Sequence, residues 1–186
     1  LFYNRSMEEM RDMSKVSVET ARAKVNLFLD IGALRADGYH DLVSLMFETR
    51  LHDRILVSGD ETGQRLDTAF GPFYFKFSQG TELDTHQEPP TITLDGWSIV
   101  RALKLYLDLC TRYDREPRLS FNTITLERNI PAQAGLGGAS SDAAALLRLI
   151  VRNDPEMEQH LMSRMVEIGA DVPFSYRGGI ALATKR

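Results

Sequence analysis

Cysteine is almost missing from this sequence: Cys110 is the only one among 186 residues. A lone thiol cannot build a disulfide framework, which excludes the small disulfide-stabilised folds. Its neighbours Tyr106, Leu107 and Leu109 are largely apolar and predict a buried side chain. His40 has no other histidine near it in the sequence, so a zinc site has no support either. The cysteine usage favours a reducing, cytoplasmic compartment.

Long apolar runs and a basic charge balance are absent too. No segment approaches the roughly 18 consecutive apolar residues of a membrane-spanning helix, and residues 1–20 lack an apolar signal core. The net charge of −4 disfavours a broad nucleic-acid surface, because binding to a phosphate backbone normally needs a basic face. A small phosphorylated ligand is compatible with this charge, since cations such as Lys24 and Arg128 can serve one pocket. We expect a soluble protein without nucleic-acid or membrane partners, with residues 1–14 as an extension and 15–186 as one domain.

Alternating apolar residues predict several strands. Over 25–31 every second residue is apolar, which is the period of a half-buried strand and places Lys24 and Asn26 on one face. The turn signal Asp37-Gly38 then indicates a hairpin. Further strands are expected in 51–58, in the "FYFKF" segment of 73–77, in 122–130 and in the final 178–184. The rest of 59–96 is rich in glycine and proline and is expected to be a loop-rich insertion.

Three stretches are expected to be helical. Polar residues recur at helical spacing between Trp97 and Cys110, which predicts an amphipathic helix. Residues 141–151 are apolar almost all round, which predicts a helix buried against a sheet. A third helix is expected over 156–168, stopped by Gly169. In contrast, "DVPF" at 171–174 is expected to be extended, because a residue before proline disfavours the helical region.

A glycine-rich loop stands between a predicted strand and a predicted helix, in "PAQAGLGGASSDAA" at 131–144. Unpaired N–H groups at a helix N-terminus attract anions, and a loop rich in glycine lets a ligand approach them. Ser140 and Ser141 could cap the helix or donate hydrogen bonds to a phosphate. The alternative is a tight turn in which glycine supplies only a positive φ. Two familiar phosphate loops are excluded: the chain has no Gly-Lys pair for a Walker A loop, and Ser140 replaces the third glycine of a dinucleotide fingerprint.

Three further groups of residues could support chemistry. Lys24 and Asn26 share a strand face, and a lysine beside a transferring phosphoryl group stabilises its charge, although a solvent-facing strand lysine is the commoner case. Asp171 could act as a general base, bind a cation or simply cap a turn. Tyr39 and His40 could stack on a nucleobase and hydrogen-bond to it, or pack beside the hairpin turn.

Together and in this order, the four motifs resemble a known family. "PAQAGLGGASSDAA" is similar to the second signature of the GHMP kinases, which include galactokinase, homoserine kinase and mevalonate kinase. The combination of "AKVNLFLDIGALRADGYHDL", "GADVPF" and "GGIA" narrows the resemblance. Within the superfamily it resembles the kinases that act on 4-diphosphocytidyl-2-C-methyl-D-erythritol in the non-mevalonate isoprenoid pathway. The resemblance runs from about residue 17 to the end, without most of 59–96.

The resemblance implies an α+β fold with a left-handed β-α-β unit, and the phosphorylation of the 2-hydroxyl group of that substrate by ATP with Mg²⁺. It makes Lys24 and Asp171 the catalytic pair, with Asp171 taking the hydroxyl proton and Lys24 polarising the reacting oxygens. Asn26 would lie beside the methylerythritol, while Tyr39 would stack on the cytosine and His40 would hydrogen-bond its edge. The ATP phosphates would be bound by Pro131, Gly135, Leu136, Gly137, Gly138, Ser140 and Ser141.

Several features of the sequence leave alternatives open. The family commonly has glycine at the position of Ala139 and asparagine at that of Ser98, and the second difference concerns contacts around the nucleotide base. The family also continues into a second domain that completes the substrate cleft. This sequence ends at Arg186, so we expect the second domain to be largely absent. The alternatives are another GHMP kinase, against which Tyr39 and His40 argue, and a non-catalytic nucleotide-binding domain.

Overall fold

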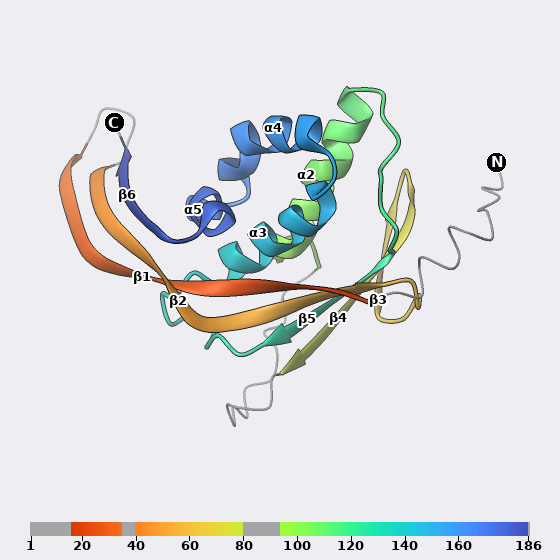
Figure 1. The fold of residues 1–186 in the computed structure, drawn as a ribbon, viewed down its shortest axis with the longest axis horizontal. Coiled ribbons are helices and arrows are strands. Elements are labelled where there is room, and N and C mark those ends of the chain that lie inside the picture. Colours follow the sequence, from red (N-terminus) through yellow and green to blue (C-terminus); the bar gives the residue numbers. More distant parts are fainter. Residues whose placement is uncertain (1–15, 35–39, 80–93, 186) are drawn as a thin grey trace.

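The computed structural model describes residues 16–34, 40–79 and 94–185. Its helices cover one face of a sheet, which gives the fold two layers (Figure 1). The strands are β1 (Ser17–Leu34), β2 (His40–Ser58), β3 (Gln64–Thr68), β4 (Gly71–Gln79), β5 (Thr123–Arg128) and β6 (Ile180–Lys185). The helices are α2 (Ser98–Arg112), α3 (Gly138–Val151), α4 (Pro155–Arg164) and α5 (Val172–Arg177), with the short 3-10 helices η1 (Leu94–Gly96) and η2 (Met165–Glu167). None of these helices is long and apolar enough to cross a membrane.

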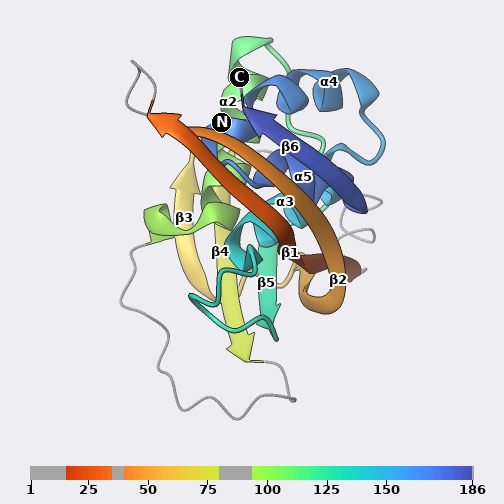
Figure 2. The same ribbon diagram turned by 90° about the vertical axis from the view of Figure 1, so that its left-hand side faces the viewer.

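Strand β2 organises the sheet, because two different strands share one of its edges. Along the first edge, β1 pairs antiparallel with β2 over nearly its whole length, as the predicted hairpin requires. Along the other edge, β6 pairs with residues 42–47 and β5 with residues 54–58 (Figure 2). Residues 48–53 of β2 therefore lie between the two ladders, and several contacts of the candidate site start from this stretch.

The segment 59–96 is more regular than its composition predicts. The expected strand at 73–77 is confirmed and extended as β4, which lies parallel to β5 and is connected to it through α2. These three elements form a β-α-β unit. β3, which was not predicted, pairs antiparallel with β4 at the outer edge of the sheet. Its exposed ion pair between Arg65 and Asp67 places charge on an edge strand, and this hides the alternation by which a strand is recognised.

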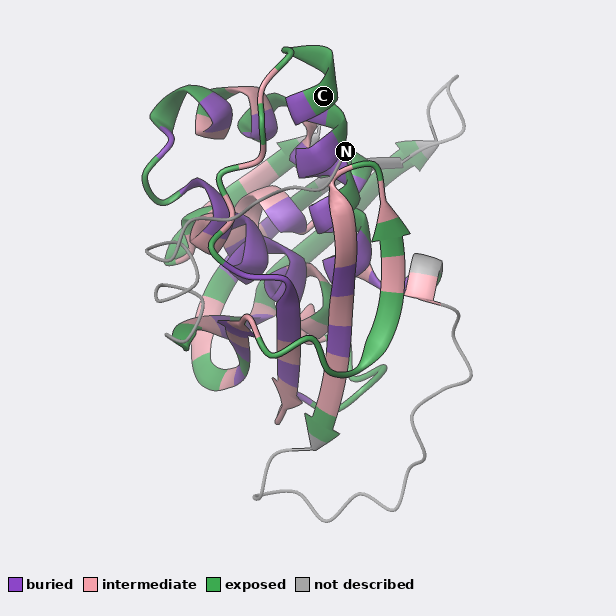
Figure 3. Cartoon of the chain, turned by 90° about the vertical axis from the view of Figure 1, so that its right-hand side faces the viewer, coloured by how far each residue is buried: buried purple, intermediate pink, exposed green. Residues whose placement is uncertain are grey.

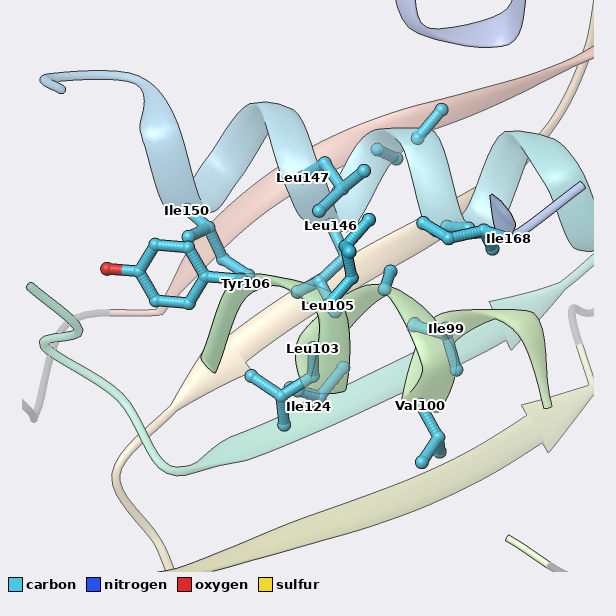
Figure 4. Packing of buried hydrophobic residues seen from close by; sticks show 14 of the residues in the cluster. Ile99, Val100, Leu103, Leu105, Tyr106, Ile124, Leu146, Leu147, Ile150 and Ile168 are labelled. Atoms are coloured by element: carbon cyan, nitrogen blue, oxygen red, sulfur yellow. The ribbon is translucent and has the colours of Figure 1, made fainter. Parts of the chain in front are cut away.

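The core lies between α2, α3 and the inner face of the sheet. α3 is buried almost all round, as its apolar sequence predicts, because it contacts β1 and β2 as well as α2 and α5. Ile99 and Leu103 of α2 pack in one cluster with Leu146 and Leu147 of α3 (Figure 4). Cys110 is fully buried in the same cluster, which confirms the prediction for the lone thiol. In Figure 3 the buried residues follow the inner faces of the helices and the central strands.

The segment "DVPF" is helical, so the expectation of an extended chain is wrong. Residues Val172–Arg177 form α5. Pro173 lies in the first turn of this helix, where an N–H group has no intrahelical partner to lose, so proline is compatible with the helix start. The third predicted helix is divided into α4 and η2, and the final predicted strand is confirmed as β6.

Candidate active site

Lys24 lies where the ladder between β1 and β2 changes register. The pairing shifts between Arg22 and Lys24, and the N–H group of Lys24 donates to the carbonyl of Leu136 in the glycine-rich loop, at 2.8 Å. The Lys24 side chain is 10% exposed, and its aliphatic part lies against Gly137. A Cβ on that glycine would come within 2.9 Å of Lys24 Cγ. The strand and the loop therefore fix each other's position.

The ammonium group of Lys24 joins two of the predicted site residues. Its Nζ donates to Oδ1 of Asn26 at 2.6 Å and lies 3.3 Å from Oδ2 of Asp171. Asn26 is held in turn, because its Nδ2 donates to the hydroxyl oxygen of Ser44, and that hydroxyl donates to the carbonyl of Phe28. The structure thus brings together side chains from one strand and from a distant helix, which the sequence separates widely.

Asp171 reaches this position from the start of α5. Its side chain makes no capping hydrogen bond to the helix and is 37% exposed, so its carboxylate is shared between the lysine and solvent. Arg148 of α3 holds the other end of α5, because it donates to the carbonyl of Ser175 at 2.7 Å. Just beyond α5, the N–H group of Gly179 donates to the carboxylate of Glu48 on β2 at 3.2 Å. α5 is thus fixed to both layers of the fold.

The glycine-rich loop needs backbone conformations that glycine adopts easily. Gly135 and Gly137 have φ of +75° and +71°, and Gln133 has a φ of +61°. Gly137 is the N-cap of α3, and the N–H groups of the first turn, from Gly138 to Ser140, have no acceptor within the helix. A Cβ on Gly135 would meet nothing within 4 Å, so there is open space beside the loop. This is the geometry of an anion site at a helix N-terminus.

The two serines of the loop differ in their surroundings. Ser141 is buried, and its hydroxyl donates to the carbonyl of Gly138 at 2.9 Å. In this conformation Ser141 does not cap α3, because its hydroxyl proton is donated to that carbonyl. Ser140 is half-buried and faces the turn after η2, where a Cβ on Gly169 would lie 3.4 Å from its Oγ. Pro131 is exposed at the start of the loop.

Two buried carboxyl groups at the base of the loop were not predicted. Asp53 of β2 is 1% exposed and accepts hydrogen bonds from the N–H groups of Asn129 and Ile130. Asp142 of α3 is 2% exposed and lies within hydrogen-bonding reach of Asp53. Burial raises the pKa of both groups, and the charge of Asp53 raises the pKa of Asp142 further. One feature of the sequence could have revealed this pair: Asp142 is an acidic residue in a predicted helix that is otherwise apolar almost all round.

The predicted pair for base recognition is not placed by the structure. Tyr39 lies outside the described residues, and of His40 the structure describes the backbone alone, which pairs with Leu34 at the start of β2. Within the described ranges, no three metal-ligating side chains cluster together. A pocket of about 300 Å³ is lined by residues of α4, η2, α5 and β6 and includes none of the predicted site residues.

Comparisons with known proteins find related sequences. Residues 98–179 match the sequence profile described as GHMP kinases N terminal domain. Over 167 residues the chain is 34% identical to the 4-diphosphocytidyl-2-C-methyl-D-erythritol kinase of Thermosipho africanus (strain TCF52B), covering 89% of this chain and 50% of that protein. Over 165 residues it is 36% identical to the kinase of the same name from Persephonella marina (strain DSM 14350 / EX-H1), covering 87% of this chain and 50% of that protein.

Solved structures support the same fold. A crystal structure of 4-(cytidine 5'-diphospho)-2C-methyl-D-erythritol kinase matches with a TM-score of 0.61 and 32% identity, covering 91% of this chain and 52% of that one. A mevalonate pyrophosphate decarboxylase from Streptococcus pyogenes, 17% identical, matches with a TM-score of 0.52 over 91% of this chain and 48% of that one, and supports the fold alone. The chain spans about half the length of the curated relatives it matches. Residues 98–179 thus match the N-terminal domain of the GHMP kinases, and over about nine tenths of its length the chain is similar to the 4-diphosphocytidyl-2-C-methyl-D-erythritol kinases.

Proposed function

We propose that this chain is the nucleotide-binding part of a cytoplasmic kinase that uses ATP to phosphorylate the 2-hydroxyl group of 4-diphosphocytidyl-2-C-methyl-D-erythritol. The observation that supports it most is the ion pair between Lys24 and Asp171, 3.3 Å long, beside a glycine-rich loop at a helix N-terminus. The names of the relatives, which share about a third of the aligned residues, support the choice of substrate.

The loop is suited to the phosphates of ATP. Three N–H groups in the first turn of α3 have no acceptor within the helix, and a Cβ on Gly135, two residues before the N-cap, would meet nothing within 4 Å. Lys24, which lies against Gly137, would place its ammonium group next to the same phosphates. Bound ATP would supply the phosphoryl group, and Mg²⁺ would neutralise the charge of its phosphates.

The catalytic pair would divide the work at the acceptor hydroxyl group. Asp171, which is partly exposed, would take the hydroxyl proton while the hydroxyl oxygen bonds to the γ-phosphorus and the bond to ADP breaks. Lys24 is almost enclosed, so its charge is weakly screened where negative charge develops. Asn26 would keep the Lys24 Nζ in place through its 2.6 Å hydrogen bond. Cytosine recognition by Tyr39 and His40 stays part of the proposal because of their sequence motif.

Phosphorus NMR tests the reaction directly. This chain is incubated with ATP, Mg²⁺ and 4-diphosphocytidyl-2-C-methyl-D-erythritol, with the kinase of Thermosipho africanus as the positive control. Transfer by both proteins supports the proposal. ATP binding without transfer by this chain would favour a non-catalytic nucleotide-binding domain, and transfer to mevalonate or homoserine instead would favour another GHMP kinase activity. Failure to bind ATP would overturn both the reaction and the nucleotide site.

A further inference from the structure

Asp53 lies where the glycine-rich loop begins and where it ends. At the beginning, its Oδ1 accepts hydrogen bonds from the N–H groups of Asn129, at 2.5 Å, and Ile130, at 2.7 Å. The side chain of Asn129 also donates to the carbonyl of His52, next to Asp53 on β2. At the end of the loop, a Cβ on Gly138 would lie 3.8 Å from Oδ2 of Asp53. One carboxylate therefore contacts or borders both ends of the loop.

Asp142 approaches Asp53 from α3, just after the loop. Its side chain is enclosed at 2% exposure, in a helix whose following residues are alanine and leucine. Its Oδ1 has no hydrogen-bond partner within the described structure, and its carboxyl group lies within hydrogen-bonding reach of Asp53. An ionised carboxylate is costly in such surroundings, because the side chain is buried and the described residues place no hydrogen-bond donor at its Oδ1.

The hydrogen bonds decide which of the two carboxyl groups carries a proton. Adjacent buried carboxylates cannot both be ionised at low cost, because burial and repulsion each favour the neutral form. Two N–H donors stabilise the charge of Asp53, so the proton belongs to Asp142, which can then donate it to Asp53. The positive charge of Arg128 on β5 acts against the rise in the pKa of both groups, but its guanidinium lies over the ring of Trp97, 4.5 Å from the ring centre.

We propose that Asp53 and Asp142 are positioning residues of the phosphate-binding loop, and that they hold its two ends together by sharing one proton. Asp53 fixes the start of the loop through Asn129 and Ile130. The protonated Asp142, one turn after Gly138, ties the N-terminal part of α3 to the same carboxylate. The consequence for ATP affinity rests on the proposed function, whereas the shared proton and the ordering of the loop can be measured without nucleotide.

Two substitutions of Asp142 distinguish the effect of its hydrogen bond to Asp53 from the effect of its titrating proton. Asp142→Asn keeps a donor toward Asp53 and removes the titrating proton, whereas Asp142→Ala removes both. Asp154→Asn is the matched control, because Asp154 is also a buried aspartate, 6% exposed, but caps α4 beyond the opposite end of α3. The readouts are amide hydrogen exchange of the peptide covering 129–141 and the affinity for ATP with Mg²⁺ by calorimetry.

We expect the two variants at position 142 to differ in both hydrogen exchange and ATP affinity. Asp142→Ala speeds exchange of the loop peptide and weakens ATP binding about tenfold or more, while Asp142→Asn stays within about twofold of the wild type in both. Asp154→Asn changes neither. The proposal is wrong if Asp142→Ala exchanges like the wild type, or if Asp142→Asn is impaired as much as Asp142→Ala. If the wild type binds no ATP, the nucleotide site fails while hydrogen exchange still tests the pair.

Proton linkage gives a second test that needs neither ATP nor the alanine variant. The pKa of Asp142 is raised on folding, so its stabilising effect is complete at low pH and is lost as the pH rises toward the folded-state pKa. Above about pH 4, where an aspartate of the unfolded chain has lost its proton, the unfolding equilibrium constant of the wild type should rise with pH relative to that of Asp142→Asn, by at most about tenfold per pH unit, until the folded-state pKa is reached. Parallel curves for the two proteins would show that Asp142 takes up no proton on folding and would overturn the shared proton.

Discussion

Two glycines of the loop offer a direct test of how Lys24 is positioned. Gly135 and Gly137 both have a φ near +70°, so alanine at either position should cost about 1–2 kcal/mol of unfolding free energy. Only at Gly137 would the new Cβ also press on Lys24, 2.9 Å from its Cγ, whereas nothing lies within 4 Å at Gly135.

We therefore expect Gly137→Ala to displace the lysine and to weaken ATP binding about tenfold beyond Gly135→Ala. Urea unfolding and calorimetry of the two variants give the two quantities. Equal ATP affinities of the two variants would show that the side-chain contact with Gly137 does not position Lys24.

Substitution of Asp171, the proposed base, should separate catalysis from binding. Asp171→Asn keeps the size of the side chain and loses both the base and the ion pair with Lys24. We expect turnover to fall by at least about a hundredfold, with ATP affinity changed by less than about threefold. Single-turnover transfer and nucleotide titration provide the readouts, with Asp30→Asn, an exposed aspartate on the same strand as Lys24, as the control. Normal turnover would remove Asp171 from the role of base.

At the residue scale, the sequence predicts side-chain contacts between residues that are close in the chain and misses contacts between residues that are far apart in it. The shared face of Lys24 and Asn26 follows from strand alternation, and their hydrogen bond confirms it. The pairing of Asp53 with Asp142 depends on a sheet and a helix meeting in space, and neither local pattern contains that information. The roles assigned to Tyr39 and His40 are still predictions.

Among the elements, α3 is linked by hydrogen bonds of Arg148 to both β1 and α5. Arg148 donates to Glu19 and to the carbonyl of Thr20 on β1, and to the carbonyl of Ser175 in α5. Arg152, one turn later, donates to Glu19 and is 54% exposed.

We expect Arg148→Met to lower the free energy of unfolding by about 2–4 kcal/mol, because it leaves half-buried carbonyl groups and Oε1 of Glu19 without their donor. Arg152→Met should cost less than about 1 kcal/mol, since its ion pair is solvated. Urea unfolding of both variants measures the difference. Equal losses would mean that Arg148 contributes no more than an exposed ion pair, and α5 would then need another anchor.

The elements that the sequence predicted are those with a strong local period. β1, α2, α3, β5 and β6 have clear alternation or helical spacing, and the structure confirms each of them. α5 was missed because Pro173 was interpreted by its effect on the preceding residue and not by its fitness for a first helical turn. β3 was missed because an edge strand with little burial has no apolar face to reveal it.

At the scale of the whole molecule, the end of β1 and the start of β2 extend with β6 beyond the helical layer (Figure 1). Large apolar side chains are exposed on these strands, among them Leu27 at 65%, Ile31 at 59% and Ile180 at 66%. Strands without a helical layer against them contribute little to the core, so we expect this part to open at low free energy.

Amide hydrogen exchange should therefore be faster in peptides covering 27–34 and 180–185 than in those covering 123–128 and 141–151. The measurement is repeated at several protein concentrations, because association through the apolar strands would protect them as concentration rises. Equal protection of all four peptides at low concentration would contradict the expectation and indicate one cooperative unit.

The shared edge of β2 sets an order of events during synthesis. Residues 42–47 leave the ribosome early, yet their partner on that edge is made of residues 180–185. Until those residues are free, the first part of this edge has unpaired backbone groups, and the Gly179 contact with Glu48 that follows α5 cannot form. Pairing between such distant segments is slow, because a long chain must close on itself before any contact is gained. The loop contacts β1, β2 and α3, all of which are synthesised before Asp171, so a nascent chain would order the proposed phosphate-binding loop before the proposed base reaches Lys24.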